Sequence, residues 1–96
     1  MTSNQANILL VEDSPSLATV YQGYLEKDHY RTSVAGSGAD ALEFLEKVTP
    51  DVVLLDLVLP DMSGMDVLKT IHERGFSCSV VIVSSSSNVS TIKTKS

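Results

Sequence analysis

Four short runs with the patterns of strands divide the chain, with amphipathic segments between them. The runs occupy residues 8–11, 30–35, 52–55 and 80–83. Aliphatic runs of this length predict buried strands, and the 52–55 run, apolar throughout, predicts the central strand of a sheet. Apolar and polar positions alternate in 30–35, which predicts a strand with one wetter face at a sheet edge.

Helical spacing follows three of the four runs. Ser14 and Pro15 form an N-cap and first-turn pair, which predicts the start of a helix. Residues 39–48 and 65–74 predict two further helices, and Gly75 ends the last of them. The apolar stripe of the first helix comprises Leu17, Val20, Tyr21, Tyr24 and Leu25. Strands that alternate with helices predict an α/β fold, a parallel sheet with helices on both faces.

The length and composition are those of one small folded domain, residues 1–96, in which 88–96 are expected to be an irregular or short helical tail. The 96 residues are 43% hydrophobic and carry a formal charge of −5. This negative charge disfavours binding to the phosphate backbone of nucleic acid. Cys78 is the single cysteine and is expected to be a small buried residue. The N-terminus has neither a basic leader nor a membrane span, and we expect a cytoplasmic protein.

Acidic and hydroxyl residues stand where the predicted strands end. Glu12 and Asp13 follow the first run, Asp56 follows the third and Ser84 the fourth. The carboxyl ends of parallel strands meet at the same end of a sheet, so these side chains should gather there. Clustered carboxylates repel one another unless they share a cation, and hard oxygen ligands suit Mg²⁺. The pattern predicts phosphate chemistry in which Asp56 is the nucleophile.

The motifs LLVEDSPS, PDVVLLDLVLPDMSGMDVL and VVIVSS, in this order and spacing, resemble the receiver domain of two-component response regulators. Among receivers, their wording is most similar to that of regulators of the LuxO and NtrC type. The resemblance covers the chain to about Ser87. It implies a flavodoxin-like (CheY-like) fold and a signalling module of a phosphorelay, not an enzyme with a diffusible substrate.

The resemblance also implies roles for individual residues. Asp56 corresponds to the phosphoacceptor, and Glu12, Asp13, Asp56 and the backbone carbonyl of Val58 correspond to protein ligands of Mg²⁺. Ser84 corresponds to the hydroxyl residue that hydrogen-bonds the phosphoryl group and acts in the switch. The phosphoryl donor is expected to be a histidine kinase or a histidine phosphotransfer protein that docks against the first helix.

The chain departs from the family pattern after the fourth strand. Receivers carry a lysine at the end of a fifth parallel strand, followed by a helix, and we expect both elements to be absent here. Lys93 and Lys95 follow Ser84 too closely to replace that lysine. The strand from Val80 to Val83 would then be an exposed apolar edge, which predicts a homodimer, a strand swap or a covering partner.

Other interpretations remain open at this point. A truncated receiver without the lysine could be a binding module or decoy for a kinase or phosphotransfer protein. Gly36, Gly38 and Ala41 form a G-x-G-x-x-A string that imitates a dinucleotide fingerprint. A phosphatase with an aspartyl nucleophile would place a second Asp where Val58 stands. Asp61 is assigned to the turn of its own loop.

Overall fold

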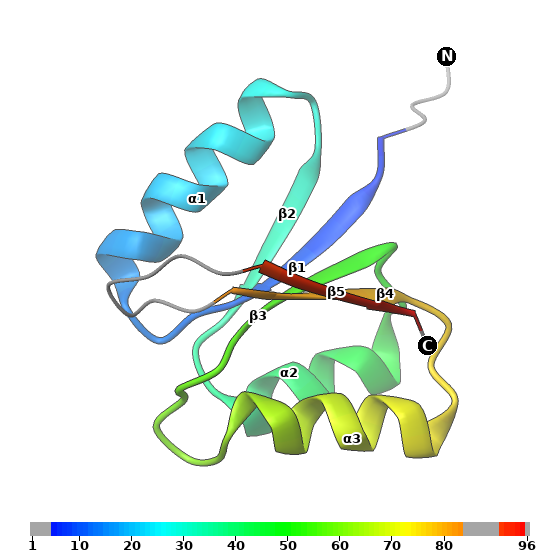
Figure 1. Ribbon diagram of the computed structural model, residues 1–96. Helices are drawn as coiled ribbons and strands as arrows, with labels where there is room; N and C mark the ends of the chain where they lie inside the picture. The colour runs from blue at the N-terminus through cyan, green and yellow to red at the C-terminus, as the bar shows by residue number, and fades with distance from the viewer. Residues whose placement is uncertain (1–4, 84–90, 96) are drawn as a thin grey trace.

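A computed structural model describes residues 5–83 and 91–95, with the backbone alone for the last segment. Strands and helices alternate along the chain as the hydrophobic pattern predicts (Figure 1). The strands are β1 (Asn7–Val11), β2 (Arg31–Ala35), β3 (Val52–Asp56), β4 (Ser79–Val83) and β5 (Thr91–Lys95). The helices are α1 (Pro15–Lys27), α2 (Gly38–Lys47) and α3 (Gly64–Arg74).

All five strands form one sheet in the order β2-β1-β3-β4-β5. The first four strands are parallel, and β3 lies at the centre as its continuous apolar run predicts. Val11 of β1 pairs with Leu55 of β3, and Asp56 pairs with Val83 of β4. The carboxyl ends of these three strands therefore lie at one level of the sheet.

Helices cover both faces of the sheet: α1 lies on one face, and α2 and α3 lie together on the other (Figure 1). Each helix begins with a serine cap, at Ser14, Ser37 and Ser63, whose side chain accepts a hydrogen bond from a backbone N–H of the first turn. Gly75 ends α3 in the left-handed conformation, with φ of 69°, as the sequence predicts.

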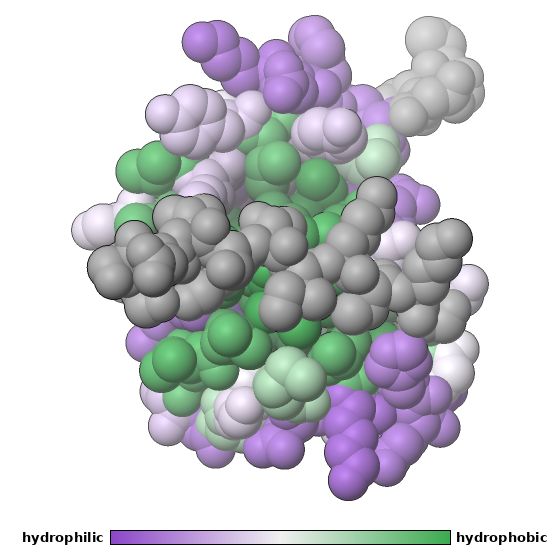
Figure 2. Space-filling view, in the orientation of Figure 1, coloured by the Kyte–Doolittle hydropathy of each residue, from purple (hydrophilic) through white to green (hydrophobic). Residues whose placement is uncertain are grey.

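The main core lies between the sheet and the α2/α3 layer. Its largest fully buried members come from both layers, among them Leu9, Leu55 and Ile82 from the sheet and Leu45 and Ile71 from the helices. Figure 2 shows hydrophobic residues gathered along the middle of the face that it presents, with hydrophilic residues above and below. Cys78 is a free, buried residue of this core, as predicted.

The stripe predicted for α1 is partly wrong. Tyr21 and Leu25 are half-buried, whereas Leu17, Val20 and Tyr24 are 38%, 50% and 69% exposed. The first helix thus packs through a narrower face than its apolar residues suggest, because α1 is the one described helix on its side of the sheet.

The structure also corrects the prediction for the last residues. Thr91–Lys95 forms a strand antiparallel to β4, not an irregular or helical tail. The family's parallel fifth strand and its helix are absent from the described residues, as predicted, but β4 is no longer an edge strand. Its outer side pairs with β5 from Val83↔Thr91 to Ser79↔Lys95. The premise of a dimer or strand swap through Val80 to Val83, an unpaired edge, is therefore wrong.

Candidate metal and phosphoacceptor site

Three carboxylates converge at the carboxyl end of the sheet. Glu12 and Asp13 follow β1, and Asp56 is the last residue of β3. One ligand oxygen from each lies within 4.8 Å of the others, so the structure brings together the acids that the sequence predicted. Glu12 and Asp56 are buried at 5% and 4% exposure, and Asp13 is exposed. The cluster thus has a buried floor and an open side.

The pKa of Glu12 is affected by its burial and by the two neighbouring acids. Burial raises the pKa of the Glu12 carboxyl above its ordinary value of 4.5, and the charges of Asp56 and Asp13 raise it further. The N–H of Ser14 donates to Glu12 Oε2 at 3.2 Å and acts in the opposite direction. A cation bound between these oxygens would relieve the repulsion that the pKa reports.

Asp56 is held by the loop that follows it, residues 57–63, which we call the acceptor loop. The N–H of Val58 donates to Asp56 Oδ1 at 3.3 Å. The loop is closed at its base by the N–H of Gly64, which donates to the carbonyl of Leu57 at 2.8 Å, and by a bridge between Val58 and Ser63. The carboxylate therefore stands at the end of a rigid strand, beside a closed loop.

Gly64 permits this close approach of loop and helix. A Cβ at this position would lie 2.3 Å from the carbonyl oxygen of Asp56 and 2.9 Å from Cα of Leu57. Both neighbours are backbone atoms that cannot rotate away. A glycine is therefore required where α3 begins, against the backbone of Asp56 and Leu57.

The remaining predicted site residues differ in what the structure says of them. Val58 is in the acceptor loop, two residues from Asp56, with its side chain 72% exposed. Ser84 lies outside the described residues, so its predicted role stays a prediction. In the register of β5, Lys93 pairs with Val81 and Lys95 pairs with Ser79, away from the carboxyl end of β4.

Asp61 is the residue whose role the sequence interpretation missed. It does not join the acidic cluster, nor does it serve only its own turn. Its Oδ1 accepts from the N–H of Gly38 and its Oδ2 from the N–H of Ala39, each at 2.9 Å. These bonds to the first turn of α2 lower the pKa of the Asp61 carboxyl. The signal available in the sequence was an acid in the loop and a glycine at the helix start, separated by more than twenty residues.

The same contact argues against a dinucleotide site. In that fingerprint the N-terminal amides of the helix bind a pyrophosphate. Here the amides of Gly38 and Ala39 already donate to Asp61, and the amide of Asp40 donates to Ser37 Oγ. Gly38 instead makes room for a side chain, since its Cβ would lie 2.4 Å from Cγ of Met62.

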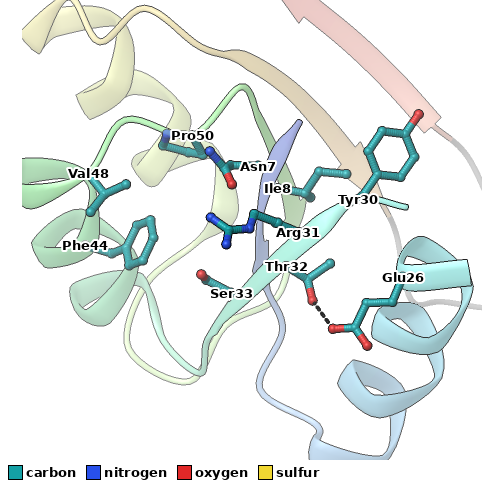
Figure 3. A pocket seen from close by; sticks show the side chains of 10 residues that line it. All are labelled: Asn7, Ile8, Glu26, Tyr30, Arg31, Thr32, Ser33, Phe44, Val48 and Pro50. Atoms are coloured by element: carbon teal, nitrogen blue, oxygen red, sulfur yellow. Dashed lines mark hydrogen bonds between the residues drawn. The ribbon is translucent and has the colours of Figure 1, made fainter. Parts of the chain in front are cut away.

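One surface groove of the described residues lies away from the acidic cluster. It encloses about 560 Å³ near the amino ends of β1 and β2, where Asn7, Arg31, Phe44 and Pro50 line it (Figure 3). A smaller apolar pocket of about 90 Å³, lined by Tyr21 and Leu54 among others, reaches Glu12 and Asp56. We place the functional site at the acidic cluster, because charged ligands that converge at the strand ends are more informative than volume.

The cluster fits a hard divalent cation. Three carboxylates supply oxygen ligands, which Mg²⁺ prefers, and the exposed side at Asp13 leaves room for water or a phosphoryl oxygen. Zinc sites usually contain His or Cys ligands, and neither residue belongs to this cluster, so among the described residues it suits magnesium better than zinc. The arrangement can hold a cation next to the Asp56 carboxylate, with solvent access on the side of Asp13.

Comparison with known proteins agrees with the geometry. The model of the response regulator receiver domain matches residues 8–95, and the chain belongs to that family. Receiver domains are signalling modules, generally phosphoacceptors in two-component systems; they bind Mg²⁺ at an acidic site and interact with histidine kinases or phosphotransfer proteins.

The relatives include regulatory proteins named LuxO. The chain is 38% identical over 82 residues to the regulatory protein LuxO of Vibrio cholerae serotype O1, covering 85% of this chain and 18% of that protein. It thus spans less than a fifth of that relative's length. The predicted similarity to LuxO-type regulators is confirmed.

Solved receivers share the fold. The signal receiver domain of a LuxO repressor protein from Vibrio parahaemolyticus has a TM-score of 0.80 and 42% identity, with 83% of this chain and 62% of that chain covered. The response regulator TrrA of Thermotoga maritima, solved in complex with Mg²⁺-BeF, has a TM-score of 0.81 and 25% identity, with 86% and 72% covered. Among the described residues, no helix is long and apolar enough to cross a membrane.

Proposed function

We propose that this chain accepts a phosphoryl group on Asp56 from a phosphohistidine, with Mg²⁺ held by Glu12, Asp13, Asp56 and the backbone carbonyl of Val58. The observation that carries the proposal is the convergence of three carboxylate oxygens within 4.8 Å at the end of the central strand. Like charges this close on partly buried groups are costly without a cation. Membership of the receiver family supports the same assignment.

Asp56 is the acceptor because of its place and its surroundings. It ends the central strand, its backbone pairs with β4, and the N–H of Val58 contacts Oδ1. In the transfer, a carboxylate oxygen of Asp56 attacks phosphorus and the bond from phosphorus to the donor imidazole nitrogen breaks, which leaves an acyl phosphate and a neutral donor histidine once a proton is taken up. Magnesium supplies charge neutralisation at the transferring oxygens.

Glu12 and Asp13 have different parts in this arrangement. Glu12 is buried and oriented by the N–H of Ser14, so it forms the fixed side of the cation site. Asp13 is exposed and can bind either the cation or one of its waters. Ser84, in the same proposal, hydrogen-bonds the phosphoryl group.

The partner is a histidine kinase or a histidine phosphotransfer protein. The exposed apolar residues of α1, Leu17, Val20 and Tyr24, lie on the helix that begins directly after the acidic cluster. An apolar surface next to the acceptor suits a helical partner that must bring its histidine to Asp56.

The test is phosphorylation of the purified chain by acetyl phosphate, read by intact mass. We expect a gain of one phosphoryl group in the presence of Mg²⁺ and no gain when EDTA replaces the metal. Asp56→Asn should abolish the adduct, and Asp66→Asn, an exposed acid in the first turn of α3, is the matched control that should keep it. An adduct that forms equally on the Asp56 variant would refute the assignment.

A second candidate is a binding module or decoy that docks the same partner without switching. The register of β5 favours it, because neither Lys93 nor Lys95 pairs with the carboxyl end of β4. Partner binding that is equally tight for the wild type, its phosphorylated form and Asp56→Ala would support this function. Binding that changes several-fold on phosphorylation would exclude it.

A further inference from the structure

We propose that Asp61 is a positioning residue for the magnesium site: its carboxylate clamps the acceptor loop to the start of α2 and so fixes the Val58 carbonyl. The inference rests on the proposed function, because it concerns the loop that supplies a ligand to that site. Its basis is a set of contacts at the base and the tip of one loop, each of them seen in the structure.

The base of the acceptor loop is held by its own backbone. Gly64 donates to the carbonyl of Leu57, and Val58 bridges to Ser63. These contacts close the loop on itself, but none of them ties it to α2.

The tip of the loop is held by α2. The amides of Gly38 and Ala39 each donate to one carboxylate oxygen of Asp61, with both distances 2.9 Å. Two bonds from one planar carboxylate fix its direction as well as its position. Such bonds to charged groups are about twice as strong as neutral ones.

Side-chain packing secures the same junction. Met62 lies over the first residue of α2, in a notch that exists because residue 38 has no Cβ. Leu59 is 8% exposed and belongs to the main core. The acceptor loop is thus anchored on both sides of Asp61, and Val58 stands between the anchored base and the anchored tip.

The clamp has a second consequence for the site. Both oxygens of Asp61 are engaged by amides at the start of α2, whose dipole also favours a negative charge there. This carboxylate is therefore kept from the cation, although it lies in the same loop as the proposed ligand Val58. The cluster retains its three acids.

The experiment measures Mg²⁺ affinity of the purified chain by calorimetric titration with MgCl₂. For Asp61→Ala we expect a Kd about tenfold above that of the wild type, as found when groups that orient metal ligands are removed. Asp61→Asn keeps one acceptor oxygen and should fall between the two. Asp40→Ala removes a carboxylate from the same helical turn, leaves the bonds of Asp61 in place and should bind as the wild type does.

A control for stability separates positioning from general weakening. Ile71→Val loosens the core on α3 away from the loop and should lower the melting temperature without changing the Kd. Unchanged affinity in both Asp61 variants would overturn the inference, and so would an equal loss of affinity in Ile71→Val.

A second readout distinguishes failure of this inference from failure of the proposed function. Absence of Mg²⁺ binding by the wild type would refute the proposed function itself. The clamp is then judged from amide NMR spectra without metal, in which Asp61→Ala should shift Val58 and Gly64 as well as Gly38 and Ala39. Shifts confined to Gly38 and Ala39 would show that the contact caps α2 and does not position the loop.

Discussion

Replacement of Gly64 by alanine should destabilise the protein and damage the acidic site at the same time. The new Cβ would meet the Asp56 carbonyl oxygen at 2.3 Å and Leu57 Cα at 2.9 Å, so α3 must move away from the carboxyl end of β3. Overpacking against backbone costs about 3 kcal/mol, at the upper end of the usual range. Alanine offsets up to about 1 kcal/mol of this loss of stability, because it lowers the conformational entropy of the unfolded chain.

The net loss is therefore about 2 kcal/mol, which in a domain of this size lowers the melting temperature by about 8 to 16 °C. Circular dichroism melts and urea titrations measure it. The matched control is Gly23→Ala, on the exposed side of α1 with nothing within 4 Å of the new Cβ. That variant should gain about 0.5 to 1 kcal/mol.

The Gly64 variant should also bind Mg²⁺ more weakly, since the acceptor loop begins and ends at the atoms that move. The reasoning is refuted if Gly64→Ala has the melting temperature of the wild type and binds Mg²⁺ equally well. It is also refuted if the two glycine variants are destabilised by the same amount.

Three further predictions concern charge and packing. Without metal, Glu12→Gln should be more stable than the wild type at pH 7: the pKa of Glu12 is raised by folding, so the wild type loses stability as pH rises from about 4.5 through the folded pKa. In urea titrations this advantage should vanish below pH 4, and an advantage that is constant with pH would contradict the cause. Leu45→Ala, at 2% exposure in the main core, should lower the free energy of unfolding by about 2 to 5 kcal/mol in the same assay. A loss below about 1 kcal/mol would contradict the burial of Leu45 between α2 and the sheet. Glu46→Ala breaks an ion pair with Arg74 that is about half exposed and should change stability by less than about 1 kcal/mol, with a larger loss showing that the pair links α2 to α3 more tightly than its exposure implies.

The alternation of apolar runs and helical stripes was enough to predict the parallel sheet and its order of elements. Such patterns report burial directly, since a strand covered on both faces must be apolar throughout, as residues 52–55 are. The cap at Ser14 and the stop at Gly75 could also be predicted, because capping is a local interaction. Local and periodic features could therefore be predicted from the sequence.

Features that depend on the partner of a segment could not. Residues 91–95 carry little apolar signal, and their pairing with β4 depends on an open strand edge that the sequence alone did not connect to them. The exposure of Tyr24 depends on what else covers the α1 face. In both cases the deciding contact is tertiary, and no local pattern reports it.

The candidate site divides in the same way. Glu12, Asp13 and Asp56 could be predicted to meet, because parallel strands bring their carboxyl ends to one level. The bonds from Asp61 to α2 and the requirement for Gly64 could not, because they depend on distances between backbone segments. The acids could be predicted from their positions at the strand ends, whereas the contacts of the acceptor loop could be seen only in the structure.

The central claim is that the acidic cluster binds Mg²⁺ beside Asp56, and NMR titration of the wild type with MgCl₂ tests it most directly. We predict saturable shifts, with one ion per chain, centred on the amides of Glu12, Asp13, Asp56 and Val58, and their loss in Glu12→Gln. An absence of shifts at these amides in the folded wild type, or identical shifts in the Glu12 variant, would contradict the account.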